Sequence, residues 1–134
     1  MKKIYLDSNL FLNSLLYEDE KANTCKKTIL KIINKEIYGI TSVLTWDEIV
    51  YVIGKNLGRE IAIKEGEQFL RFPNLKFIDV NKEVILEAQK LIKIYKLKPR
   101  DAIHIATALS QNCTEIITDD SDFDGIKEIK RIAL

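Results

Sequence analysis

The chain alternates between short apolar runs and longer stretches in which apolar residues recur every three or four positions. The first pattern is typical of buried β-strands and the second of amphipathic helices. Four runs predict strands, at residues 4–6, 37–41, 75–80 and 115–118, and a run at 129–133 is a candidate for a fifth. One predicted helix follows the Asp7-Ser8-Asn9 segment and ends at Leu16, and the others span residues 22–34, 44–57, 59–72, 82–95 and 99–110.

Several of these elements begin or end at residues with special backbone preferences. The Asp7-Ser8-Asn9 segment offers residues that commonly cap a helix N-terminus. Gly58 suits the end of a helix, and Pro73-Asn74 is typical of a turn. Pro99 fits the first position of the last helix, which is apolar nearly all round and is therefore predicted to be buried.

Helices between successive strands favour a parallel sheet, because each return to a parallel neighbour needs a crossover connection. Helices then cover both faces of that sheet. The sequence therefore predicts an α/β fold, a three-layer α/β/α sandwich with a central parallel sheet of four to five strands. A length of 134 residues suits a single domain, residues 1–134.

Composition restricts the function classes. Hydrophobic residues make up 46% of the chain and charged residues 31%, as in globular proteins. The formal net charge is only +1, so an argument for nucleic acid binding must come from the placement of charges. Cys25 and Cys113 form no CxxC pair, so we expect buried, reduced thiols and no zinc site. No signal peptide or membrane span is evident, so we expect a cytoplasmic protein.

Acidic residues gather where predicted strands end. Asp7 directly follows the first strand, and three acids directly follow the fourth: Asp119, Asp120 and Asp122. Parallel strands share one carboxyl edge, and ligands of such folds bind beyond it. We therefore expect these acids to lie close together although they are far apart in the sequence.

Two further acids are predicted near the same edge. Glu48 lies within the first two turns of its helix among apolar neighbours, and Asp101 lies in the first turn of the buried helix. Carboxylates held close together resist ionisation unless a cation neutralises them. Oxygen ligands select Mg²⁺ or Mn²⁺, and such ions can hold a phosphodiester and activate a water. The pattern predicts a metal centre for phosphodiester cleavage.

Each of these residues also has a simpler interpretation. Asp7 or Ser8 can cap a helix, Asp101 can complement a helix dipole, and the acids after the fourth strand can form a solvated turn. Their coincidence at one edge favours a single site. His104 lies almost one turn beyond Asp101 and could reach that site, but a packed helix histidine is the favoured interpretation. Trp46 is expected in the core.

Four blocks of the sequence resemble those of PIN domains, most closely the VapC toxins of prokaryotic toxin–antitoxin pairs. They are residues 4–9 (IYLDSN), 46–52 (WDEIVYV), 100–108 (RDAIHIATA) and 118–123 (TDDSDF). The resemblance covers the whole chain with the blocks in the family's order, and the last two blocks are the most specific.

The resemblance implies roles for individual residues. Four acids match the positions that bind the metal and carry catalysis: Asp7, Glu48, Asp101 and Asp120. Ser8 and Thr118 match hydroxyl positions that steady the acidic cluster, and Asp122 matches a supporting acid. Asp119 fills a variable position, which leaves open whether Asp119, Asp120 or Asp122 is the fourth ligand.

The resemblance implies a divalent-metal-dependent endoribonuclease in which a metal-activated water attacks the RNA phosphate. It also implies the role of toxin in a type II toxin–antitoxin pair, inhibition by a small antitoxin protein, and a homodimer. Cleavage is expected to survive the loss of His104. Lys98 and Arg100, beside Asp101, are candidates for contacts to substrate phosphates.

Other functions stay open at this point. A PIN-like module could bind RNA or protein without cleaving, and a PIN nuclease could act in RNA processing. A phosphatase is less favoured, because Asp7-Ser8-Asn9 lacks the DxD motif. The sequence does not decide between RNA and DNA. Nucleotide-binding and serine-hydrolase motifs are absent from the sequence.

The residues also predict a homodimer independently of the family. The helices over residues 44–72 carry apolar residues, including Val52, Ile61 and Phe69, that exceed what one small sheet can cover. Excess apolar surface is usually buried against a partner.

Overall fold

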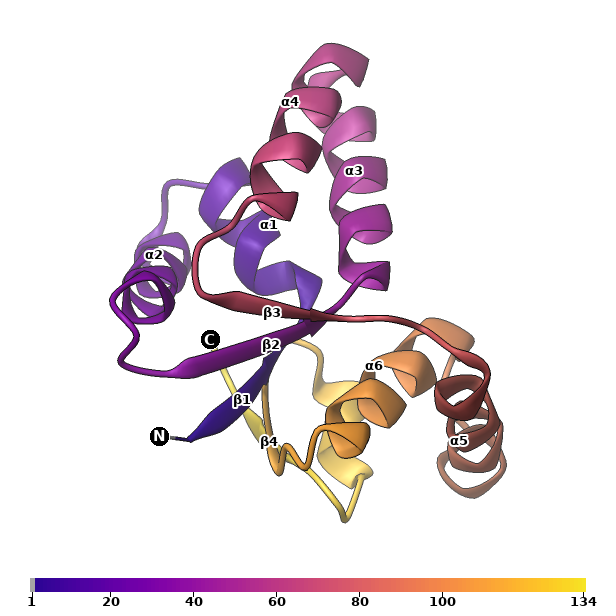
Figure 1. Cartoon of the computed structure of the whole chain (residues 1–134). Helices are drawn as coiled ribbons and strands as arrows, with labels where there is room; N and C mark the ends of the chain where they lie inside the picture. Colours follow the sequence, from indigo (N-terminus) through magenta and orange to yellow (C-terminus); the bar gives the residue numbers. More distant parts are fainter. Residues whose placement is uncertain (1) are drawn as a thin grey trace.

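A computed structural model describes residues 2–134 and contains a parallel sheet with helices on both faces (Figure 1). All strand pairs are parallel and the strand order is β3-β2-β1-β4-β5. The strands are β1 (Lys3–Leu6), β2 (Tyr38–Ser42), β3 (Leu75–Ile78), β4 (Glu115–Ile117) and β5 (Lys130–Ile132). The predicted fold class is confirmed, and so is the candidate fifth strand.

The helices follow the predicted order and mostly the predicted bounds. They are α1 (Ser8–Leu16), α2 (Glu20–Ile33), α3 (Leu44–Leu57), α4 (Arg59–Leu70), α5 (Lys82–Tyr95) and α6 (Pro99–Ser110), with a short 3₁₀ helix, η1 (Ser121–Gly125). Helix α2 begins earlier than its apolar spacing indicates, because Asp19 caps it by accepting from the Ala22 N–H. The segment now seen as η1 was not predicted to be helical.

Strand residues alternate between two cores. Tyr5 and Ile40 face the core shared with α5 and α6, whereas Ile4 and Leu6 face the core shared with α1, α2, α3 and α4. Figure 1 shows the same division, with the α3–α4 hairpin on one side of the sheet and the α5–α6 pair on the other. This alternation is what a strand buried on both faces requires.

Two predictions about individual apolar residues were wrong. Trp46 was expected in the core, but the residue is 39% exposed and its indole lies against α4 beside Gly66. Phe69 was expected to contribute excess apolar surface, but it is only 5% exposed. It lies in the last turn of α4, where the hairpin returns to the sheet, and packs edge to face on Phe11 and Phe77.

Two further expectations concern the cysteines and the presence of a membrane span. Cys25 and Cys113 are free and buried, as predicted. Within residues 2–134, no helix has both the length and the apolar character needed to cross a membrane.

The strand order places a topological switch point at the centre of the sheet. The chain moves outward from β1 to β2 and β3, then returns to β4 on the other side of β1. At such a point the connections leave the two adjacent strands in opposite directions, which opens a crevice beyond their carboxyl ends. Asp7 and Thr118 directly follow β1 and β4, so both lie at this crevice.

Candidate metal centre

Thr118 joins the two strand ends at the switch point. Its buried hydroxyl donates to Asp7 Oδ2 at 2.8 Å and accepts from the Asn9 amide and from the Asp120 N–H, each at 3.1 Å. Asp7 is only 6% exposed and also accepts from the Ser8 N–H at 2.7 Å. The capping interpretation of Asp7 is therefore correct, and the same carboxylate also lines the crevice.

The loop after β4 brings a second set of acids together. Asp120 caps η1 by accepting from the Asp122 N–H at 2.9 Å. Carboxylate oxygens of Asp101, Asp120 and Asp122 lie within 4.8 Å of one another. This group joins the first turn of α6 to the loop, as the convergence of strand and helix ends predicts.

Glu48 reaches the crevice from α3 and meets His104 of α6. The His104 Nε2 atom lies 2.6 Å from Glu48 Oε1 and 3.6 Å from Asp7 Oδ1. The other ring nitrogen, Nδ1, lies 2.6 Å from the Tyr5 hydroxyl. Potential ligand atoms of Asp7, Glu48 and His104 also lie within 4.8 Å of one another.

The electrostatics of this region are those of crowded acids. Burial, followed by the charges of Asp120 and Asp7, raises the pKa of Asp101 from 3.8 to about 6. Burial alone would lower the pKa of His104, but the hydrogen bond to Glu48 and the charge of Asp7 outweigh it, so that pKa is raised. The structure thus concentrates negative charge that a cation would neutralise.

These residues fit a hard divalent cation. The four predicted acids supply oxygen ligands from four different elements, and each belongs to one of the two tight groups. Oxygen donors match Mg²⁺ and Mn²⁺. Burial, together with the charges of Asp120 and Asp7, raises the pKa of Asp101, as expected of a carboxylate held close to other acids.

The remaining predicted residues lie around this centre. Ser8 is buried, and its hydroxyl is 3.5 Å from Asp7 Oδ1. Asp119 points away and pairs with Lys21 at 2.7 Å, so it belongs to neither acidic group. Arg100 and Lys98 line two separate hollows, the first together with Glu48 and the second together with Asp101.

Sequence reasoning missed the part played by Asn9. Its side-chain Nδ2 donates to the Thr118 hydroxyl and its side-chain Oδ1 accepts from the Asp119 N–H at 3.2 Å, so it ties α1 to the loop after β4. The residue was visible in the Asp7-Ser8-Asn9 segment but was interpreted only as a cap. His104 is buried, as expected for a packed histidine, but it also contacts two of the site's acids.

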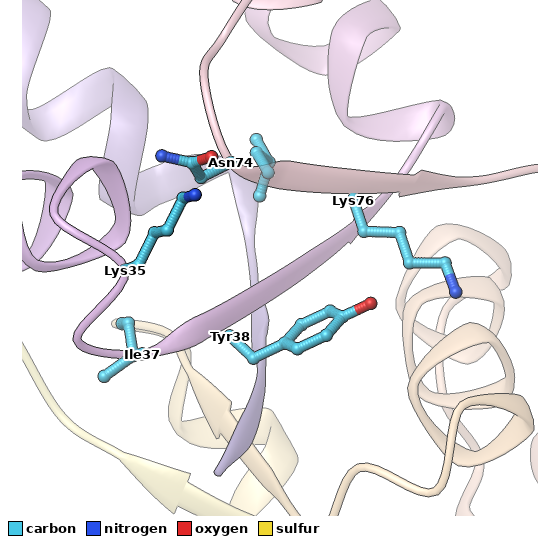
Figure 2. Close-up of a pocket in the computed structure, with 6 residues that line it drawn as sticks. Lys35, Ile37, Tyr38, Asn74 and Lys76 are labelled. Carbon is cyan, nitrogen blue, oxygen red and sulfur yellow. The ribbon is translucent and has the colours of Figure 1, made fainter. Parts of the chain in front are cut away.

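A hollow of about 350 Å³ elsewhere in the molecule has a different character (Figure 2). It lies where β2 and β3 begin and is lined by Lys35, Ile37, Tyr38, Asn74, Leu75 and Lys76. No acid lines it, and it lies towards the amino ends of the strands, whereas the acids follow their carboxyl ends. It is therefore separate from the candidate centre.

Comparisons with known proteins agree with this geometry. The family model for the PIN domain matches residues 4–129. Ribonuclease VapC2 of Methanocaldococcus jannaschii is 27% identical over 144 residues, which cover 98% of this chain and 94% of the relative. Ribonuclease VapC6 of the same organism is 28% identical over 150 residues, which cover 96% of this chain and 95% of the relative.

Solved structures share the fold. The Mycobacterium tuberculosis VapC20, a toxin that cleaves the sarcin–ricin loop, has a TM-score of 0.76 at 14% identity and covers 94% of this chain and 98% of its own. DNA-bound VapBC from Salmonella typhimurium has a TM-score of 0.75 at 19% identity, and the match covers 99% of this chain and 98% of that chain. At these identities the likeness concerns the fold alone.

Proposed function

Because the chain belongs to the PIN domain family, we propose that it is a divalent-metal-dependent endoribonuclease. One observation carries the proposal: four carboxylates from separate elements meet at the switch point of the sheet, in the two groups described above. Two relatives that span nearly the whole chain are named ribonucleases, which supports RNA as the substrate.

In this proposal Asp7, Glu48, Asp101 and Asp120 hold Mg²⁺ or Mn²⁺, and Asp122 supports Asp101 and Asp120. A bound divalent ion supplies Lewis acidity, which makes a water more acidic and stabilises a leaving oxygen. The protein contributes the fixed positions of the acids, since Thr118 and Ser8 hold Asp7 and the η1 backbone holds Asp120. No side chain is needed as a nucleophile.

Substrate phosphates would lie along the two hollows that these acids help to line. Arg100 lines one and Lys98 the other, and both side chains are exposed. Arg100 makes only a long contact of 3.4 Å with Asp47, so its guanidinium can turn to a phosphate at little cost. These contacts would orient the strand without reading its sequence.

We propose further that the chain is the toxin of a type II toxin–antitoxin pair, inhibited by a small antitoxin protein, and that it forms a homodimer. The names of the relatives and the complexes among the structural neighbours support this role. A PIN nuclease of RNA processing would share the same site chemistry. Identification of a protein that copurifies with the chain and blocks its cleavage would separate the two roles.

The test uses two neighbouring acids as a matched pair. Asp120 belongs to the acidic cluster, whereas Asp119 is paired with Lys21 outside it. We expect the wild type to cleave single-stranded RNA with Mg²⁺ or Mn²⁺ and to stop when EDTA is added. Asp120→Asn should abolish cleavage, and Asp119→Asn should retain it. DNA of the same sequence serves as the second substrate.

Three results would contradict the proposal. Cleavage that continues in EDTA would exclude the metal requirement, and equal activity of the two variants would remove Asp120 from the site. A wild type that binds RNA but cleaves it under no metal condition would instead support a non-catalytic binding module.

A further inference from the structure

His104 is a histidine whose two ring nitrogens both have partners although the ring is almost completely buried. Its exposed fraction is 1%, with Glu48 on Nε2 and the Tyr5 hydroxyl on Nδ1, each at 2.6 Å. The rings of His104 and Tyr5 also pack edge to face, with centroids 5.7 Å apart. The imidazole is thus held on both sides.

The Glu48 carboxylate fixes the direction of its hydrogen bond to the ring. An ionised carboxylate only accepts hydrogen bonds, so Nε2 must carry the hydrogen that faces Glu48. In the neutral ring Nδ1 then accepts from the Tyr5 hydroxyl, and in the protonated ring Nδ1–H donates to the Tyr5 oxygen, so the contact is kept in both states.

Glu48 needs such a partner more than the other acids do. It lies on a helix and not at a strand end, and a glutamate has one more side-chain torsion to fix than an aspartate. Asp7 accepts from Thr118 and Ser8, and Asp120 accepts from a backbone N–H. Among residues 2–134, the hydrogen bond that the Glu48 carboxylate accepts comes from His104.

We propose that His104 is a positioning residue: with Tyr5 behind it, its Nε2–H holds the Glu48 carboxylate in the orientation in which it binds the metal. The inference rests on the proposed metal-dependent function. A ligand's hydrogen-bond partner typically accounts for about 10–100-fold in metal affinity. His104 itself stays outside the coordination shell, because both of its ring nitrogens are already engaged. Nε2–H donates to Glu48, and Nδ1 is hydrogen-bonded to the Tyr5 hydroxyl.

The test exploits the different reach of two amide side chains. In His104→Gln the amide nitrogen lies near the place of Nε2 and can still donate to Glu48. In His104→Asn the amide is one methylene shorter and falls short of Glu48. His104→Leu keeps volume but removes the donor. Thr107→Val is the control, because the Thr107 hydroxyl is also buried in α6 but donates to the Ile103 carbonyl of its own helix.

Mn²⁺ is the probe, and its binding is measured directly by EPR and calorimetry on protein shown to be folded by its melting curve in EDTA. We expect His104→Leu and His104→Asn to weaken Mn²⁺ binding by about 10–100-fold. His104→Gln should lie within a few-fold of the wild type, and Thr107→Val should match it. RNA cleavage by His104→Leu should fall most at limiting metal and recover as metal is raised.

Several outcomes would overturn the inference. They are an unchanged Mn²⁺ affinity in folded His104→Leu, a His104→Gln variant no better than His104→Leu, and a wild type that binds no Mn²⁺. Electron spin echo spectra showing a nitrogen ligand on wild-type Mn²⁺ would make His104 a ligand instead. If the Mn²⁺ affinities of the variants follow the expected order but the wild type does not cleave RNA, the positioning role is supported and only the proposed function is contradicted.

Discussion

At the scale of single residues, the raised pKa of Asp101 links the site to the stability of the fold. Because its folded pKa is about 6 and its ordinary value 3.8, the folded protein binds this proton more tightly than the unfolded chain does. The ionised carboxylate therefore destabilises the metal-free protein. This cost grows as the pH rises from about 4 to about 6 and is fully present above that range.

Asp101→Asn should remove this cost. One pKa unit corresponds to about 1.4 kcal/mol, and solvent screening at this half-buried group reduces the total to about 1–2 kcal/mol. The lost interaction with the helix dipole offsets about 0.3–1 kcal/mol. We expect the metal-free variant to be more stable than wild type by about 1 kcal/mol near pH 7.5, with the difference vanishing near pH 4. The variant should not cleave RNA.

Melting curves of both proteins in EDTA from pH 4 to 8, with one cleavage assay, check this prediction. If Asp101 served only its helix, Asp101→Asn would be less stable wherever the carboxylate is ionised and would cleave normally.

The sequence located the acids better than it located their partners. Asp7 and Asp120 could be placed because strand ends share one edge, which follows from hydrophobic periodicity alone. The hydrogen bonds of Asn9 and His104 depend on side-chain orientation and on contacts between distant elements, and periodicity carries neither. The choice between Asp119 and Asp120 was equally inaccessible, since it depends on which side of the loop faces Lys21.

At the scale of elements, the α3–α4 hairpin depends on a close approach at Gly66. A Cβ atom there would lie 2.8 Å from Val50 Cγ2 and 3.0 Å from Trp46 Nε1. A Cβ at Gly54, in the facing helix, would meet Ala62 Cβ at an ordinary 3.7 Å. The two glycines therefore make a matched pair with opposite expected effects.

Gly54→Ala should stabilise the protein by up to about 1 kcal/mol, because alanine favours a helix interior over glycine. Gly66→Ala has the same helical gain but must displace a stiff valine and an indole, an overpacking cost of about 1–3 kcal/mol. We expect a net loss of about 1 kcal/mol, or about 4 °C in melting temperature. A rise in melting temperature for both variants would show that Val50 and Trp46 do not restrict the space at Gly66.

Element boundaries show where periodicity loses information. The starts and ends of α3, α5 and α6 were predicted correctly, and the start of α6 follows from Pro99 at the first helical position. Strand β3 was predicted to reach residue 80 but ends at Ile78, which is the last residue that pairs with β2. The apolar Val80 extends the sequence pattern beyond that pairing. The turn of η1 has few apolar residues and depends on the Asp120 cap, so hydrophobic pattern alone could not reveal it.

At the scale of the whole molecule, the hairpin also presents apolar side chains to solvent. Residues that stay substantially exposed on it are Trp46, Tyr51, Leu57, Ile61, Ile63 and Leu70. Of the three residues named from the sequence, Ile61 belongs to this set, whereas Phe69 is buried and Val52 is half-buried, so the surface differs from the one predicted. The remaining residues still support the proposed homodimer.

Sedimentation at about 20–50 µM, where a standard-sized interface should hold, tests the dimer. We expect the wild type to sediment as a dimer and Ile61→Lys as a monomer with the same circular dichroism. The control is Ile94→Lys on α5, since Ile94 is more exposed (68%, against 42% for Ile61) but lies off the hairpin. A monomeric wild type would refute the dimer, and a dimeric Ile61→Lys would place the interface elsewhere.

The hydrogen bond between Asp7 and Thr118 also has a consequence for how the protein is made. The two residues are 111 positions apart, and β1 lies between β2, which follows soon after it, and β4, which is synthesised much later. At about 5–20 residues per second, a ribosome needs roughly 6–20 seconds to add the missing partner. During that interval the nascent chain has no complete acidic centre, so a ribonuclease of this design cannot cleave its own messenger RNA before the segment after β4 has been synthesised.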